Sequence, residues 1–159
     1  MNGWLLGAII AVVVIVVVIK RLKGEPLNAR DLLIPPVVLT TIGVVSLAKA
    51  EDLTGTDLAW VIPGALLGCG LGAVRGATVQ LFEKAGALWQ RYTGRTFLVL
   101  AGSLVIMGGF GLLATHAGVS EGARPVQLNI GVSFLGEALV IGVRGLVSGV
   151  PFAPGHPRR

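Results

Sequence analysis

Long apolar runs divide the chain, and each is longer than an ordinary β-strand and almost free of charge. Runs of about 17 or more apolar residues are typical of helices that cross a membrane. The five runs lie at about residues 4–19, 32–48, 58–74, 96–115 and 126–147. The pattern predicts an all-α polytopic transmembrane bundle of five helices, formed by a single domain at residues 1–150. The proline-rich end of the chain, residues 151–159, is predicted to be a disordered cytoplasmic tail.

The longest polar stretch, residues 76–95, separates the third run from the fourth. Within it, β-branched and aromatic residues at 79–84 and 87–92 flank a glycine turn at Gly86. This arrangement favours a short β-hairpin. The alternative is that the third helix continues into the polar stretch.

The distribution of basic residues indicates the orientation in the membrane. Lys and Arg are concentrated in the cytoplasmic loops of multi-pass proteins. With the N-terminus outside, eleven of the 13 basic residues fall on the cytoplasmic side, and only Lys49 and Arg124 fall on the outer side. The sequence therefore predicts that the N-terminus lies outside, that the C-terminus lies inside, and that the hairpin segment is cytoplasmic.

The first run has no polar face, since every residue from Ile9 to Ile19 is Ile, Val or Ala. Lys20 and Arg21 follow it directly, whereas a cleaved signal peptide would have its basic residues first. We therefore expect an uncleaved anchor that forms a peripheral helix at the lipid-facing edge of the bundle.

A short internal repeat links the ends of two later runs. Residues 72–76 are Gly-Ala-Val-Arg-Gly, and residues 141–145 are Ile-Gly-Val-Arg-Gly. A duplication would make the chain one peripheral helix plus two parallel-repeated hairpins, related by rotation about the membrane normal. Chance similarity is the alternative, because Val, Gly and Ala are abundant throughout the chain.

Glycines mark the faces on which we expect helices to pack. Small residues let the backbones of two membrane helices approach closely. They recur every four residues in the third run and form an adjacent pair in the fourth. These predicted helix-packing residues are Gly64, Gly68, Gly72, Gly76, Gly108 and Gly109.

Composition narrows the classes of function. The chain is 53% hydrophobic and 13% charged, against about 25% charged in soluble domains. Its net charge of +5 does not indicate nucleic acid, because the basic residues flank apolar runs and form no patch. The single cysteine, Cys69, cannot form an internal disulfide or a redox pair. We find no spacing typical of metal ligands and expect no cofactor.

Glu137 is the most informative polar residue, because it lies near the middle of the fifth run. A carboxylate at the centre of a bilayer costs about 2.5–3.5 kcal/mol on insertion scales. We therefore predict an intramembrane polar site formed by Glu137, Arg75 and Arg144. Functionally, Glu137 could bind a proton or cation, and the two arginines could bind an anionic headgroup. Structurally, Glu137 could make one interhelical hydrogen bond, and the arginines could fix the depth of their helices.

Three short segments resemble the CcdC-like family of small bacterial integral membrane proteins. They are Arg-Leu-Lys-Gly-Glu-Pro-Leu at 21–27, Arg-Gly-Ala-Thr at 75–78 and Leu-Trp-Gln-Arg-Tyr at 88–92. The resemblance covers most of the chain and implies a multi-pass protein of the bacterial cytoplasmic (inner) membrane. The family is associated by name with cytochrome c biogenesis, and the resemblance assigns no catalytic residue.

We expect a non-enzymatic assembly or accessory component that packs through its Gly-rich helices with itself or with another membrane protein. Its other partners would be the lipid bilayer and anionic headgroups at the cytoplasmic face. Two alternatives stay open. One is an oligomeric transporter or channel that uses Glu137 and the inner arginines, and the other is an intramembrane enzyme acting on lipid.

Overall fold

The computed structural model describes residues 2–154, and five of its helices are long and apolar enough to cross a membrane. The long helices are α1 (Gly3–Lys23), α2 (Ala29–Ala48), α3 (Gly55–Thr78), α4 (Gly94–His116) and α5 (Val126–Ser148). The short elements are β1 (Glu25–Pro26), β2 (Gln80–Lys84), β3 (Ala87–Arg91) and the 3₁₀ turn η1 (Glu121–Ala123). The predicted number and class of helices are confirmed. All five extend beyond the apolar runs at one or both ends.

Polar side chains outside the apolar runs determine where several helices begin. Thr54 and Thr93 each accept a hydrogen bond from the backbone amide three residues later, which completes a capping box at α3 and at α4. The side chain of Asn28 accepts a hydrogen bond from the amide of Arg30 at the start of α2. These caps satisfy amide groups that have no partner within the helix.

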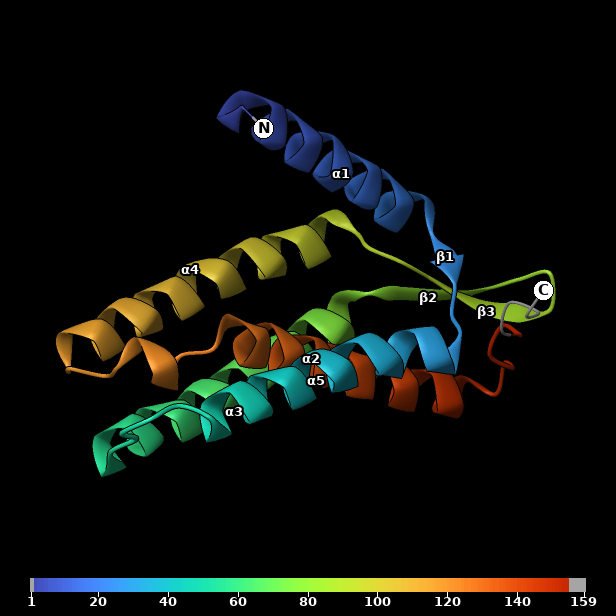
Figure 1. Cartoon of the computed structure of the whole chain (residues 1–159). Helices are drawn as coiled ribbons and strands as arrows, with labels where there is room; N and C mark the ends of the chain where they lie inside the picture. Colours follow the sequence, from blue (N-terminus) through green and yellow to red (C-terminus); the bar gives the residue numbers. More distant parts are fainter. Residues whose placement is uncertain (1, 155–159) are drawn as a thin grey trace.

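α5 is the central helix of the bundle, because it packs against both α2 and α3 (Figure 1). Its small residues allow the close approach on each side. A Cβ atom added at Gly131 would lie 2.5 Å from the backbone nitrogen of Thr40 in α2, and one added at Gly136 would lie 2.9 Å from the carbonyl carbon of Cys69 in α3. α4 packs against α3. α5 therefore packs against two helices that are distant from it in the sequence.

The predicted β-hairpin is present between α3 and α4. β2 pairs antiparallel with β3, and the turn places Ala85 and Gly86 at positive φ. β1 pairs with the other edge of β3, which gives a three-stranded sheet in the order β1-β3-β2. Because successive helices alternate in direction, the sheet gathers the ends of all five long helices on one side of the molecule (Figure 1). We call this side the sheet end.

The segment after α5 corrects part of the predicted disordered tail. The amide of Leu88 donates to the carbonyl of Pro151 at 2.9 Å, and the amide of Ala153 donates to the carbonyl of Leu27 at 2.9 Å. Phe152 lies in a parallel bridge with Leu88. The amide of Leu88 lies in β3 beyond the end of β1, and the carbonyl of Leu27 lies between β1 and α2, and these two groups explain why this segment is ordered. The rest of that tail, residues 155–159, lies outside the described residues.

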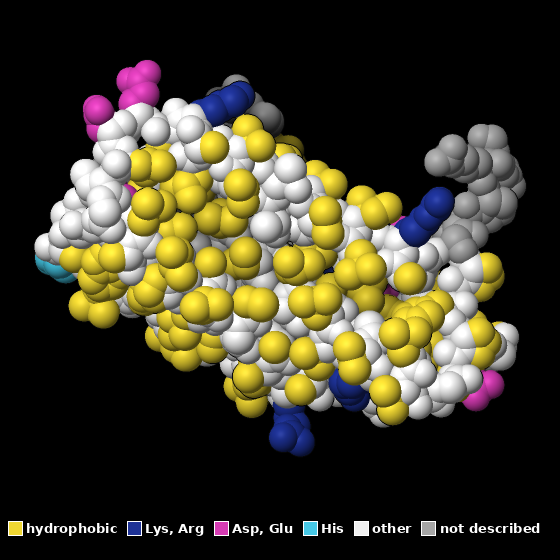
Figure 2. Space-filling model, turned by 90° about the horizontal axis from the view of Figure 1, so that it is seen from below, with side chains coloured by type: hydrophobic (Ala, Val, Ile, Leu, Met, Phe, Trp, Pro, Cys, Tyr) yellow, Lys and Arg dark blue, Asp and Glu magenta, His cyan; other side chains and the backbone are white. Residues whose placement is uncertain are grey.

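α1 lies apart from the other helices, as its uniform apolar surface predicted. None of its described residues is buried, and a Cβ atom added at Gly3 or Gly7 would meet nothing within 4 Å. It is attached to the fold only near the sheet (Figure 1). The rest of the molecule is also apolar outside, and Figure 2 shows hydrophobic side chains across the middle of one face with charged side chains toward its margins. So large an apolar surface is suited to lipid and not to water.

The glycine stripe of α3 is a packing face. Gly64 lies against Phe110 of α4, and Gly68 lies against Val132 of α5. A Cβ atom added at Gly76 would lie 2.7 Å from the carbonyl oxygen of Glu137, and Gly72 is packed as closely on the backbone of Ser133.

Gly108 and Gly109 differ from the prediction, since a Cβ atom at either would meet no described atom within 4 Å. These two glycines do not pack within this chain, because α4 turns its opposite face, with Ser103 and Ala114, toward the bundle.

The two hairpins of the predicted duplication are not pairs of tightly packed neighbours. In the described chain, α2 and α3 each contact α5 far more than they contact each other, and α4 contacts α3 far more than α5. The two halves are therefore interleaved. The duplication itself stays a prediction.

Candidate functional site

The structure brings together Arg75 of α3 and Glu137 of α5, and both side chains are almost fully buried. The Arg75 Nε atom donates to Glu137 Oε2 at 2.7 Å, and a terminal guanidinium nitrogen lies 2.6 Å from the same oxygen. That terminal nitrogen also donates to Ser133 Oγ at 3.4 Å. The guanidinium carbon lies 5.0 Å from the centre of the Phe134 ring, a cation–π distance. Glu137 is therefore paired with a charge from another helix.

Tyr92 completes this site, and we call Arg75, Glu137 and Tyr92 the buried cluster. The Tyr92 hydroxyl donates to Glu137 Oε1, so each carboxylate oxygen has a partner. Burial, and then the negative charge of Glu137, raise the pKa of the Tyr92 hydroxyl above its usual range. The phenol therefore stays protonated as a donor. The Arg21 guanidinium lies 5.0 Å from the centre of the Tyr92 ring, which connects α1 to the cluster.

Arg144 is not a partner of Glu137. Its terminal nitrogen donates to the carbonyl of Gly76 at 2.8 Å and to that of Val79 at 2.7 Å. These carbonyls belong to the end of α3 and the residue after it, where helix geometry leaves acceptors without intrahelical donors. Arg144 thus fastens the end of α3 to α5. Of the three predicted site residues, the structure brings two together and assigns the third to a helix end.

The sequence indicated Glu137 and Arg75, but it did not single out Tyr92, which binds Glu137, or Ser133, which binds Arg75. Tyr92 follows β3 in a polar segment, and Ser133 is one of several small residues in α5. The contact of Ser133 with Arg75 depends on α5 packing against α3, and that of Tyr92 with Glu137 depends on where the chain runs after β3. The one usable signal was that a buried acid needs a basic partner, and Arg75 was among the few candidates.

A cavity of about 240 Å³ adjoins the buried cluster at the sheet end. It lies between the first turns of α2, the middle of α5, β1 and β3. One part of its wall is polar and the other is apolar. The polar residues are Arg21, Glu25, Asn28, Asp31, Gln90 and Glu137. We call this space the polar cavity.

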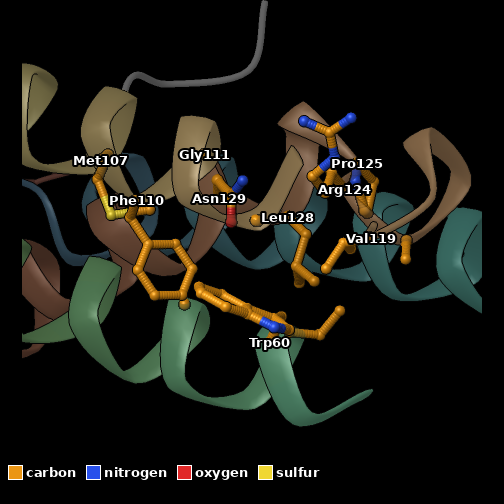
Figure 3. Close-up of a pocket in the computed structure, with 13 residues that line it drawn as sticks. Trp60, Met107, Phe110, Gly111, Val119, Arg124, Pro125, Leu128 and Asn129 are labelled. Atoms are coloured by element: carbon orange, nitrogen blue, oxygen red, sulfur yellow. The ribbon is translucent and has the colours of Figure 1, made fainter. Parts of the chain in front are cut away.

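A second, smaller cavity of about 50 Å³ is lined by residues of α3, α4, η1 and α5, away from the sheet end. Trp60 of α3 and Phe110 of α4 point toward one another there, with ring centres 5.3 Å apart (Figure 3). Asn129 and Arg124 supply its polar groups. The space holds no more than one or a few water molecules, so it is a packing defect between helices and not a ligand site.

Among residues 2–154, no three His, Cys, Asp or Glu side chains group as metal ligands would. The lone Cys69 is partly exposed beside the close contact of α3 with α5. The buried cluster can hold one negative and one positive charge away from water. Chemically, the cluster neutralises the charge of Glu137 and holds hydrogen-bond donors at fixed positions around its carboxylate.

Comparisons with models of protein families, with curated proteins and with solved structures find no match for this chain. The role of the buried cluster is therefore argued from its geometry alone. The three segments that carry the resemblance to the CcdC-like family, residues 21–27, 75–78 and 88–92, meet at it. Tyr92 donates its amide to the carbonyl of Arg21 at 2.9 Å, and its hydroxyl binds the partner of Arg75.

Proposed function

We propose that this protein is a non-enzymatic assembly component of a bacterial cytoplasmic membrane, and that it associates with a second copy through the outward face of α4. The observation that carries the proposal is the pair of small-residue sites on that face. Ala101-Gly102 and Gly108-Gly109 are seven residues apart, which places them two turns apart on one face, about 10 Å along the helix. All four residues are exposed.

The surroundings of these sites support contact with another helix. Val105 lies between them and is 75% exposed, so the face has one apolar side chain between two patches of small residues. Small residues on a lipid-facing helix allow close backbone approach by another helix. A two-fold dimer would place each α4 against its own counterpart.

α1 adds a second unpacked surface. Its Ile and Val side chains are exposed along its whole length, and in Figure 1 it diverges from α4 without packing on it. A second copy that binds at α4 could also cover part of α1. The buried cluster supports a structural role for Glu137 in this proposal, since Arg75 and Tyr92 occupy both of its oxygens.

Cross-linking in native membranes tests the assembly. In a Cys69→Ala background, Val105→Cys is expected to form a disulfide-linked dimer on mild oxidation, because a two-fold axis at α4 brings residue 105 close to its counterpart. Leu66→Cys, on the exposed face of α3, is the matched control and should remain monomeric. Gly109→Leu should weaken association about tenfold, because its larger side chain would keep the two helix backbones apart. Equal cross-linking at residues 66 and 105 would contradict the proposal.

The orientation is part of the same proposal, with the N-terminus outside and the sheet end in the cytoplasm. It is supported by the concentration of Lys and Arg in the segments that form the sheet end. Labelling of single cysteines with a membrane-impermeant maleimide in intact cells is the measurement. Asn2→Cys and Ser120→Cys should be labelled from outside, and Lys84→Cys should be labelled only after lysis. The reverse pattern would overturn the orientation.

A transporter or channel, and an intramembrane enzyme acting on lipid, are the alternative functions. Both are favoured by one observation, that Glu137 lines the polar cavity. Both need the carboxylate to exchange partners during turnover. Loss of a transport or lipid-modifying activity in a Glu137→Gln variant that folds would favour them over the assembly role.

Membership of the CcdC-like family is also proposed. It is supported by the convergence of the three resembling segments on the sheet and the buried cluster. A role beside cytochrome c biogenesis, if the family's name applies here, would be that of a membrane partner.

A further inference from the structure

The polar cavity contains a buried group that lacks a partner. Gln90 lines it from β3 and is only 8% exposed, and its Oε1 atom has no hydrogen-bond partner among residues 2–154. A buried amide oxygen left unpaired is destabilising, and nearly all such groups in native proteins are satisfied. The terminal torsion of glutamine is soft, so Oε1 can turn toward the cavity at little cost. The missing partner is therefore a hydrogen-bond donor.

The charges around the cavity indicate what kind of donor fits. The described residues hold two ion pairs, Arg21 with Glu25 at 3.4 Å and Arg75 with Glu137. Asp31 lines the cavity and belongs to neither pair. The net charge of the side chains around the cavity is therefore negative. A donor that carries positive charge, such as a protonated amine, would be attracted to Asp31 and would satisfy Gln90.

Arg21 provides a position for a phosphate in the same cavity. Its guanidinium lies on the face of the Tyr92 ring, and its Nε atom lies 3.4 Å from Glu25. Arginine binds phosphate oxygens through two parallel hydrogen bonds. The amine and the phosphate of one small headgroup could then lie at Gln90 and Arg21, with about 240 Å³ to contain them.

The apolar part of the wall suits an acyl chain. Pro35 and Leu39 of α2 and Phe134 of α5 continue from the polar residues along the membrane-spanning helices. Apart from Glu137, the polar residues lie at the end of α1, around the start of α2 and in the strands, which is where the hydrocarbon of a bilayer would meet its headgroups. The cavity therefore has its polar and apolar parts in the order that a lipid has.

We propose that the polar cavity binds a phosphorylated primary amine, with the ammonium group at Gln90 and Asp31 and the phosphate at Arg21. The shared chemistry has two sources, the headgroup of an aminophospholipid and a free phosphorylated amine. This site does not depend on the proposed assembly through α4, because none of its residues lies on that helix.

Binding to lipid nanodiscs tests the proposal with the full chain. Native mass spectrometry would compare retention of phosphatidylethanolamine with that of phosphatidylcholine, which has no N–H donor, and phosphatidylglycerol, which has no amine. We expect at least a tenfold preference for phosphatidylethanolamine. Phosphoethanolamine added to the delipidated protein in detergent distinguishes the sources: competition by it at equal affinity indicates a free phosphorylated amine, and failure to compete indicates the lipid.

Variants connect the preference to the cavity. Gln90→Met keeps the length of the side chain and removes the amide, and it should reduce the preference about tenfold. Asp31→Asn should also reduce the preference for phosphatidylethanolamine. Because Asp31 is exposed at the start of α2, this variant should fold and can test the site if Gln90→Met does not fold. Gln80→Met, on β2 and outside the cavity, is the matched control. Equal retention of the three lipids without binding of phosphoethanolamine, or an unchanged preference in Asp31→Asn and in folded Gln90→Met, would overturn the proposal.

Discussion

Replacing Arg75 with methionine is expected to lower the free energy of unfolding by about 3–5 kcal/mol, because it leaves the Glu137 carboxylate buried with Tyr92 as its remaining partner. The cost comes from the uncompensated charge and not from lost packing, since methionine keeps most of the apolar length of the arginine side chain. Unfolding in mixed micelles with increasing SDS, followed by circular dichroism, is the measurement.

Two further variants separate the effect of the buried Glu137 charge on stability from other effects of the substitution. Glu137→Gln removes the negative charge and should cost less than Arg75→Met if the arginine can reach water at the sheet end. The double variant Arg75→Met with Glu137→Gln should recover stability relative to Arg75→Met alone, because no unpaired buried charge is left. A loss below about 1 kcal/mol in Arg75→Met would mean that Glu137 is neutral in the folded protein.

Gly72→Ala is expected to cost about 3 kcal/mol in the same measurement. Its Cβ atom would lie 2.7 Å from the carbonyl carbon of Ser133, a backbone atom that cannot move without shifting α5. Overpacking of an interior by one carbon costs about 1–3 kcal/mol, and a clash with backbone belongs at the upper end.

Gly70→Ala is the matched control in the same helix, where a Cβ atom would meet nothing within 4 Å. It should be neutral or stabilising, by up to about 1 kcal/mol, because alanine has the higher helix propensity. Similar losses for both variants would show that α3 and α5 do not approach each other at Gly72.

The apolar runs were sufficient to predict five helices, because a bilayer imposes a minimum length that few soluble elements reach. They could not predict the helix ends. Asn28, Thr54 and Thr93 cap helices from positions outside the runs, so hydropathy does not register them. The hairpin between α3 and α4 was predictable from its own residues, since Gly86 provides the turn that two short strands need.

The buried cluster was only partly predictable. An unpaired carboxylate inside a membrane is costly in any fold, so the sequence alone predicted that Glu137 has a polar partner. The choice of Arg75 over Arg144 depends on which helices contact α5 and at what height. That choice follows from close contacts such as the one between Gly136 and the backbone of Cys69, which no local pattern specifies. Gly108 resembles those glycines in sequence, but it faces away from the chain.

The central position of α5 also determines when the protein can be completed. Membrane helices leave the ribosome in order, and α5 is the last of the five. Until it is synthesised, α2 and α3 lack the helix against which both pack, and Arg75 lacks its carboxylate. The nascent chain must therefore wait in the membrane as loosely associated spans, and α5 closes the bundle in one late step. A stop codon before α5 would remove the closing step itself and leave α2 and α3 without their common partner.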